Sequence, residues 1–323
     1  MNRSLLKKNI TEARLLFGAC FLALFAFCYL RVFIVSRLEM SSFAKIIGEL
    51  WDKWSQFSPV SLDQLLSYSG RIAITFDEPI VVLCIAVFAI ARGSAAVSGE
   101  IDRGTLEMLL AQPISRPRIL FSQGSVTVYG LALLSLAVWA GITAGIYTFR
   151  VKEESAPPSI RIPVVDFKIE LPFGKREKVI VPLHERVDAG MFFPAAVNLF
   201  CFGVCLAGTA TFFSSFDRYR WRTIGITVTL LILQMIAKLA GTALEELRFL
   251  KLATIFTTYE PQKIVDRAVH TPDTVWSLLL YTADGRFEQL GPLGFDLVML
   301  GIGLAGYVAA TVIFVRRDVP APL

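Results

Sequence analysis

Residues 189–216 read AGMFFPAAVNLFCFGVCLAGTATFFSSF and contain no charged side chain. A helix needs about 20 consecutive, mostly apolar residues to cross the hydrocarbon core of a bilayer, and this run exceeds that length. Its apolar residues are continuous rather than alternating, which favours a helix over a strand of a membrane barrel. The stretch therefore predicts a membrane-spanning helix.

Five further long and mostly apolar runs, most of them interrupted by a few charged residues, lie near residues 15–35, 72–97, 119–149, 223–244 and 295–315. The composition agrees, because 54% of the 323 residues are hydrophobic and 18% are charged, compared with about 45–50% and about 25% in soluble domains. The sequence therefore predicts one transmembrane domain, residues 1–323. Its fold class is an all-α polytopic membrane protein with six transmembrane helices.

Basic residues indicate the orientation of these spans. They precede the first span and lie between spans two and three, between spans four and five, and after span six, in four clusters: Arg3, Lys7, Lys8 and Arg14; Arg92, Arg103, Arg116 and Arg118; Arg218, Arg220 and Arg222; Arg316 and Arg317. Basic flanks stay cytoplasmic. We expect a multi-pass protein of the plasma (inner) membrane with cytoplasmic termini and a cytoplasmic loop at 98–118, and with extracytoplasmic loops at 36–71, 150–188 and 245–292. The net charge of +5 then reflects topology in the lipid bilayer and gives no reason to expect a nucleic-acid partner.

Two outward segments carry their own patterns. Apolar residues recur at helical spacing between residues 40 and 57, which predicts a helix lying in the outer interface. In 152–188, stretches 160–171 and 178–183 favour strands on either side of Pro172-Phe173-Gly174-Lys175, which predicts a small β-hairpin.

Motifs that carry chemistry are missing from the sequence. There is no G-x-x-x-x-G-K-[ST] phosphate loop, no H-E-x-x-H helix and no G-x-S-x-G elbow. All five cysteines lie inside apolar runs, where cysteine behaves as a small hydrophobe. We expect no enzyme activity, no metal site and no cofactor bound by this chain.

Some residues within the spans are ionisable or small. The ionisable residues map near the outer ends of the spans: Arg31, Asp77, Glu78, Lys238 and Asp296. Two roles are open for them, pairing with one another at the membrane interface or lining a path for an ion. The small ones predict close helix packing on one face each of spans three and four: Ala137, Gly141 and Gly145, and Gly203, Ala207 and Thr211.

The loop at 98–118 predicts a short amphipathic helix between two spans. Gly104 ends the preceding helix, Thr105 is placed to cap the next one, and Pro113 stops it within about two turns. Leu106, Leu109 and Leu110 share one face. We expect this face to form an apolar ridge, either exposed to the cytoplasm or resting on lipid.

The order of residues in this loop resembles the signature loop of type-2 ABC exporter permeases. Ser98-Gly99-Glu100, Gly104-Thr105-Leu106, Leu109-Leu110, Pro113 and Ser115-Arg116 occur in the order found in that family. The resemblance implies that 98–118 is a coupling helix docked on a separate ABC ATP-binding subunit, which binds ATP and Mg. The residues it assigns to coupling are Glu100, Gly104, Thr105, Leu106, Glu107, Leu109, Leu110, Pro113 and Arg116.

The predicted function is the permease subunit of an ATP-driven exporter for an unidentified substrate. Six spans form half of a translocation unit, so a second permease copy or a paralogue is expected. The outward segment 152–188 is longer than is usual in the family. It motivates an alternative, a mechanotransmitter that acts on an extracytoplasmic partner without transport. An ion-coupled carrier would need charges near the midplane, whereas these lie near span ends.

Overall fold

The structure is a computed structural model that describes residues 3–38, 66–154, 159–162, 167–170, 178–281 and 286–317. Within these ranges, six helical segments are long and apolar enough to cross a membrane: α1 (Arg3–Arg37), Tyr68–Ser94, α8 (Arg116–Thr148), Ala189–Phe216, α10 (Arg220–Ala243) and α12 (Pro292–Arg316). The predicted six-helix polytopic architecture is confirmed.

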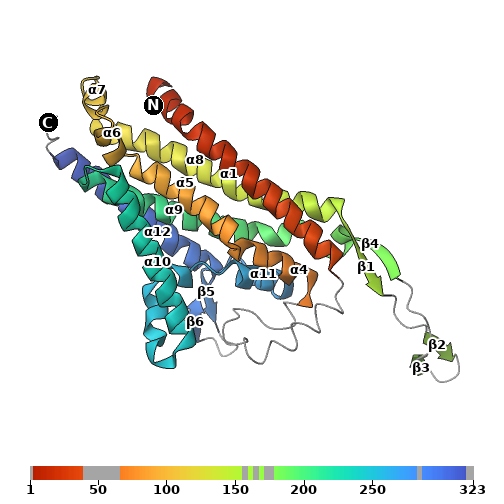
Figure 1. Ribbon diagram of the computed structural model, residues 1–323. Coiled ribbons are helices and arrows are strands. Elements are labelled where there is room, and N and C mark those ends of the chain that lie inside the picture. Colours follow the sequence, from red (N-terminus) through yellow and green to blue (C-terminus); the bar gives the residue numbers. More distant parts are fainter. Residues whose placement is uncertain are drawn as a thin grey trace.

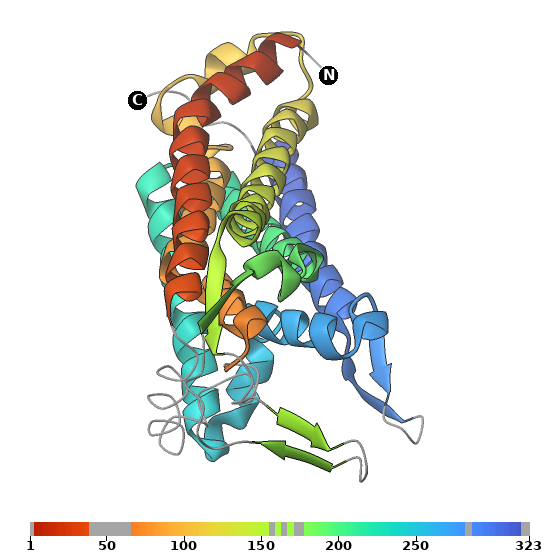
Figure 2. The ribbon, with the colours of Figure 1, turned by 90° about the vertical axis from the view of Figure 1, so that its right-hand side faces the viewer.

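Both termini lie at the same end of the helical bundle, together with the loop between the second and third spans (Figures 1 and 2). An even number of crossings requires this arrangement. We call this the terminal end, and we call the opposite end, where the strands lie, the far end. The predicted interfacial helix at 40–57 falls outside the described residues.

The second span is broken near the far end. It consists of α4 (Tyr68–Ala73), the 3-10 turn η2 (Ile74–Asp77) and α5 (Pro79–Ser94). Pro79 occupies the first turn of α5, where its missing N–H costs nothing because a first-turn N–H has no partner within the helix. The break leaves Asp77 and Glu78 between two helical pieces.

The fourth span forms the centre of the bundle. It begins with η4 (Ala189–Phe192) and continues as α9 (Phe193–Phe216). α9 packs most closely on α12, where a Cβ on Gly303 would lie 2.7 Å from the Val204 carbonyl oxygen and one on Gly306 would lie 2.6 Å from that of Gly208. Glycines at these positions let the two backbones approach to a distance that any side chain would prevent.

The small residues of the third span serve the same purpose. A Cβ on Gly141 would lie 2.7 Å from the Phe25 carbonyl oxygen, and one on Gly145 would lie 2.6 Å from the Val32 Cβ. Both contacts are with α1, so the small face of α8 packs against the first span, as the sequence pattern predicts.

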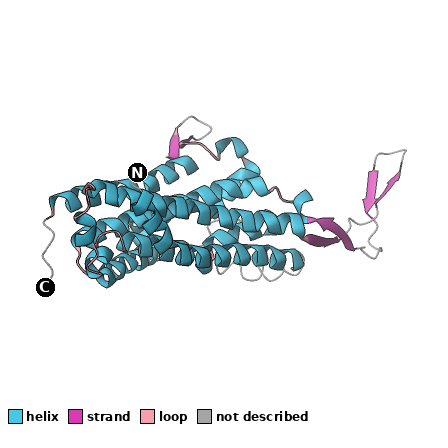
Figure 3. Ribbon diagram, turned by 90° about the horizontal axis from the view of Figure 1, so that it is seen from above, coloured by secondary structure: helices cyan, strands magenta, loops and turns pink. Residues whose placement is uncertain are grey.

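The far end carries three two-stranded antiparallel ladders (Figure 3) among the described residues. β1 (Arg150–Glu154) pairs with β4 (Lys178–Pro182), β2 (Ser159–Ile162) with β3 (Phe167–Glu170), and β5 (Leu279–Tyr281) with β6 (Phe287–Leu290). A β-structure in 152–188 is therefore present, but the predicted pairing of 160–171 with 178–183 is wrong. The first stretch folds back on itself, and the second pairs with the chain that leaves α8.

Short helical elements complete the far end. They are η3 (Leu183–Glu185), η5 (Glu245–Ala253), η6 (Ile255–Thr257), α11 (Pro261–His270) and η7 (Pro272–Thr274). Tyr259, between η6 and α11, donates a hydrogen bond from its hydroxyl to the Phe76 carbonyl at 2.6 Å. Burial and the nearby Asp77 charge raise the pKa of this phenol well above its ordinary value. This contact holds the α11 region against the break in the second span.

Candidate functional site

The loop at the terminal end contains two one-turn helices. α6 spans Ser98–Asp102 and α7 spans Leu106–Leu110, before α8 begins at Arg116. Gly104 separates them with φ +67, a backbone conformation that residues with a Cβ adopt at a cost. A Cβ here would meet no atom within 4 Å, so it is the backbone conformation rather than crowding that requires glycine.

Thr105 occupies the N-cap position of α7, but its side chain does not cap that helix. Its hydroxyl instead donates a 2.6 Å hydrogen bond to Glu100 Oε2. The predicted cap is therefore wrong: the hydroxyl donates to the charged Glu100 carboxylate and accepts no N–H from the first turn of α7. The residue ties α7 back to α6.

The predicted exposed ridge is also wrong. Leu106 and Leu109 are only 2% and 8% exposed, whereas Met108, between them on the opposite face, is 71% exposed. Leu110 is half-buried. The apolar face of α7 is turned toward the protein, and the face open to solvent carries Glu107 and Met108.

The elements that cover these leucines explain the inversion. Leu106 clusters with Val97, Leu120 and Phe314, and Leu109 clusters with Leu5 and Ile119. Phe314 is near the end of α12, Leu5 is at the start of α1, Ile119 and Leu120 are at the start of α8, and Val97 immediately precedes α6. An apolar face that meets apolar helix ends is buried there in preference to water.

A carboxylate in α6 connects the loop to the first span. Glu100 is 3% exposed and accepts hydrogen bonds from Lys8 Nζ at 2.8 Å and from Arg103 Nη2 at 2.8 Å, in addition to the one from Thr105. Burial alone would raise the pKa of this carboxyl, but the hydrogen bonds from Lys8 and Thr105 and the charges of Lys8 and Arg103 outweigh it and lower the pKa. Glu100 is therefore an ionised anchor inside the protein and is not an exposed contact.

Glu12 on α1 extends the same charge cluster. Its carboxylate lies 3.7 Å from Lys8 Nζ and 3.9 Å from the guanidinium groups of Arg92 and Arg103. The start of the first span, the end of the second span and the loop thus share one network of alternating charges.

A second buried network connects the loop to the fourth and fifth spans. The Ser214 hydroxyl of α9 accepts hydrogen bonds from the backbone N–H groups of Val97 and Ser98 at 3.0 and 2.9 Å. Ser98 Oγ lies 3.1 Å from Thr223 Oγ1 of α10. The Ser214 side chain therefore satisfies the N–H groups at the start of α6, which no helical carbonyl can reach.

Three arginines at this end bind carbonyl groups at the ends of other helices. Arg116 Nη1 donates to the carbonyls of Phe314, Val315 and Arg317 at 2.8–3.2 Å. Arg317 Nη1 donates to the carbonyls of Ser215 and Asp217, and Arg220 Nη2 donates to that of Ala91. Cations at helix C-termini satisfy free carbonyls and oppose the helix dipole.

In the sequence these arginines are recognisable only as topology markers and, for Arg116, as a coupling residue implied by the family resemblance. Their partners lie far away in the chain, up to 201 residues for the Arg116–Arg317 contact. No local pattern reveals such a pairing.

The exposed surface of the loop between Ser98 and Pro113 comprises Asp102, Arg103, Gly104, Glu107, Met108, Ala111, Gln112 and Pro113. Of the coupling residues assigned by resemblance, Gly104, Glu107 and Pro113 lie on this surface. Glu100, Leu106 and Leu109 lie beneath it, and Arg116 caps α12.

The five ionisable residues predicted near the outer ends all lie toward the far end, but they form three separate sets. Arg31 Nε is 3.2 Å from Glu78 Oε1, which is the predicted kind of pair. Lys238 Nζ donates to the Phe256 carbonyl at 2.6 Å, and the Lys238 ammonium also interacts electrostatically with Asp77. Asp296 accepts a 2.7 Å hydrogen bond from Asn198 Nδ2.

The arrangement of the helices and of the loop at the terminal end defines a class of protein. Six spanning helices, with both ends of the chain at one end of the bundle beside a short helical loop tied to several spans, describe a multi-pass membrane protein. Among the described residues, no group of three or more His, Cys, Asp or Glu side chains is placed to hold a metal ion.

Comparison with known families identifies the class more closely. The family model described as "ABC-2 family transporter protein" matches residues 7–319, almost the whole chain. The chain therefore belongs to the ABC-2 family of transporter proteins, and the resemblance seen in the loop is confirmed. No curated protein matches the chain.

Proposed function

We propose that this chain is the permease subunit of an ATP-driven exporter in the plasma membrane, and that a separate ATP-binding subunit docks on the loop at 98–118. One observation carries the proposal. The loop exposes a compact surface at the terminal end, and buried contacts fasten the opposite side of the same loop to α1, α8, α9, α10 and α12. A force applied to the exposed side would reach five of the six spans.

Such a subunit would undergo conformational change and would carry out no covalent reaction. ATP and Mg would be held by the partner, and closure of two such partners would push on the loops. Each loop would then tilt its bundle as a rigid body, which is a common form of switching between two packed states. A second permease copy or a paralogue would complete the pathway, with the termini on the cytoplasmic side.

Exposure in the structure determines which substitutions test docking. Leu106 and Leu109 are inside the protein, so charges there would disturb the fold of the loop itself. Met108 and Ala111 are exposed on one side of α7, so the double substitution Met108→Asp/Ala111→Asp leaves the packed face intact. Leu252→Asp is a matched control, because Leu252 is 86% exposed but lies in η5 at the far end.

The experiment is affinity purification of each variant after co-expression with a candidate ATP-binding subunit. We expect the double variant to insert normally but to lose the partner, since two unpaired charges at a contact centre cost about 2 kcal/mol or more. The control should retain the partner. Full retention by the double variant, with unchanged ATP turnover, would show that 98–118 is not the docking element.

A second candidate function is favoured by the extension at the far end. The β1–β4 ladder continues from α8 beyond the helices, and the β2–β3 ladder lies further along the same arm (Figure 1). A mechanotransmitter would use this arm to act on an extracytoplasmic partner. It predicts ATP turnover stimulated by that partner with no solute accumulation in sealed vesicles, whereas an exporter predicts accumulation.

A further inference from the structure

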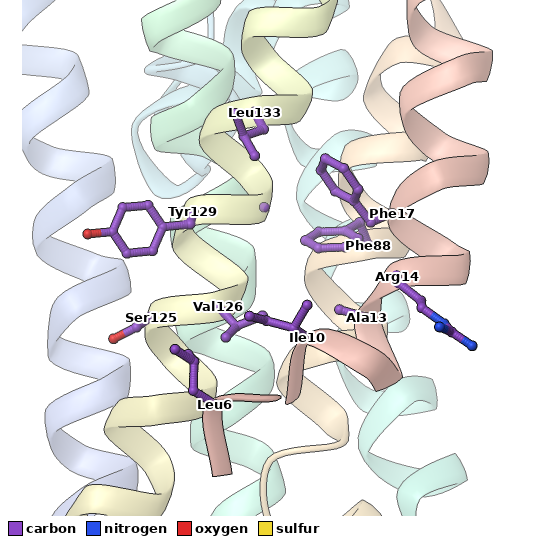
Figure 4. Close-up of a pocket in the computed structure, with 11 residues that line it drawn as sticks. Leu6, Ile10, Ala13, Arg14, Phe17, Phe88, Ser125, Val126, Tyr129 and Leu133 are labelled. Atoms are coloured by element: carbon purple, nitrogen blue, oxygen red, sulfur yellow. The ribbon is translucent and has the colours of Figure 1, made fainter. Parts of the chain in front are cut away.

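A cavity of about 440 Å³ lies between α1, α5 and α8 toward the terminal end (Figure 4). This volume falls within the roughly 300–1,000 Å³ of typical small-molecule sites. The first turns of α1 lean over toward the start of α8 (Figure 2), so Leu6 and Ile10 cover the cavity at its terminal side. Phe88 of α5 closes the back, with its ring packed on Gly130 of α8.

The shape and lining of the cavity match a hydrocarbon chain. The lining is almost entirely apolar, and residues 125–133 of α8 extend along it for about 12 Å at 1.5 Å per residue. That length is close to the thickness of one leaflet's hydrocarbon, about 15 Å. Ile10, Tyr129 and Leu133 are each half or more exposed, so the cavity is open on its flank at membrane depth.

Three exposed cations lie on α1 and α8, the helices that form most of the cavity. Arg14 lines the cavity, and its guanidinium points to the outer side of α1 in Figure 4. Lys7 lies two turns before Arg14 on the same side of α1, and Arg118 lies two turns before Ser125 on α8. All three are exposed, and none forms an ion pair with any residue in the described part of the chain. The only nearby acid on α1, Glu12, is engaged by Lys8, Arg92 and Arg103.

We propose that this cavity binds one acyl chain of an anionic phospholipid, whose phosphate lies at the rim beside Arg14. Arg14 immediately precedes the first uncharged stretch of α1, so it marks the level of the headgroups. The part of the cavity lined by Phe17, Phe88 and Leu133 lies beyond it, at the level of the acyl chains. The occupant is chosen by charge complementarity. Arg14 is part of the lining, Lys7 and Arg118 lie two turns away on the two helices that form the cavity, and a neutral lipid would leave these exposed cations unmatched. The lipid would join α1 to α8 beside the loop that α1 anchors through Lys8.

The test uses the purified full-length chain in a neutral detergent. It is titrated with phosphatidylglycerol or with phosphatidylcholine of identical acyl chains, and bound lipids are counted by native mass spectrometry. We expect one phosphatidylglycerol to bind at least about fivefold more tightly than phosphatidylcholine, because each basic residue near a headgroup contributes about 1 kcal/mol. Equal affinities for the two lipids would overturn the proposal.

Two matched pairs of variants locate the site. Leu133→Trp fills the cavity and should abolish the tightly bound phosphatidylglycerol, whereas Leu239→Trp places the same ring on the exposed side of α10 and should not. Arg14→Gln should lower the preference about fivefold. Arg316→Gln removes the same charge from an exposed position at the end of α12 and should leave the preference unchanged.

Retention of the tight lipid by Leu133→Trp, or an equal effect of Arg14→Gln and Arg316→Gln, would contradict the assignment. The oligomeric state is measured in the same spectra. If Leu133→Trp dissociates a dimer that Leu239→Trp leaves intact, a second copy covers the cavity and the lipid proposal is wrong.

Discussion

The fourth and fifth spans are neighbours in sequence, have almost the same mean hydropathy, and occupy opposite environments. In the most apolar 18-residue window of each, 72% of the fourth span is buried but only 11% of α10. α9 presents glycine and alanine to three other helices, whereas α10 presents isoleucine and leucine to its surroundings. Hydropathy thus determines that a segment enters the membrane, and residue size determines whether it becomes the core.

The largest effect on stability is expected when a glycine on each of these two helices is replaced by leucine. Gly208 of α9 lies directly against the backbone of Gly303, whereas Gly225 of α10 has nothing within 4 Å of a Cβ. Gly208→Leu should cost about 3 kcal/mol or more, because backbone cannot yield as a flexible side chain can. Gly225→Leu should be nearly neutral.

Thermal unfolding in detergent, followed by tryptophan fluorescence, measures both glycine variants. Similar melting temperatures for the two would show that the α9–α12 contact is looser than the structure describes. The proposed centre of the bundle would then need to be reassigned.

A smaller effect is expected for hydroxyl groups on the same two helices. Ser214→Ala leaves the N–H groups of Val97 and Ser98 buried without an acceptor, which costs about 1–3 kcal/mol per group. Thr229→Ala removes an exposed hydroxyl from α10 and should change stability by less than about 0.5 kcal/mol. Proteolysis of the 98–118 loop provides a local measure: Ser214→Ala should accelerate cleavage there, and equal cleavage rates in the two variants would contradict the role of Ser214.

The same contrast between buried and exposed recurs for two carboxylates in the loop, Glu100 and Glu107. The pKa of Glu100 is lowered in the folded protein, so its contribution to stability is fully present above its ordinary value of 4.5 and is lost as the pH falls below that value. Wild type should therefore lose thermal stability between pH 5 and pH 3 more steeply than Glu100→Gln does.

Glu107→Gln provides the control for that experiment, because Glu107 is exposed to solvent on α7. Its melting temperature should follow wild type over the whole pH range. If Glu100→Gln also follows wild type, the charge cluster with Lys8 and Arg103 does not stabilise the loop.

Much of the architecture could be predicted from the sequence because it depends on lengths and local chemistry. A run of apolar residues long enough to cross the bilayer must be helical, since lipid offers no partner for an open backbone. Gly104 and Pro113 bracket a helix in the loop because of their own backbone preferences. The family signature lies in this same stretch, so the class of protein could also be predicted from the sequence alone.

What the sequence left open was which way each element faces. Leu106 and Leu109 share a helical face in any structure, but only the folded chain brings Leu5, Leu120 and Phe314 to cover it. Periodicity defines a face and does not identify its neighbour.

The longest-range features depended entirely on the tertiary structure. Arg116 reaches carbonyls near residue 315, Glu100 pairs with Lys8, and β4 pairs with β1 rather than with the nearer stretch 160–171. The sequence by itself determined the six spans, their helical form and the position of the loop, because each follows from interactions within a few residues or with lipid. Burial of the loop's leucines, the arginine caps and the cavity between α1 and α8 were decided only when distant helix ends met, because a free carbonyl or an apolar face is satisfied by whatever the fold places beside it.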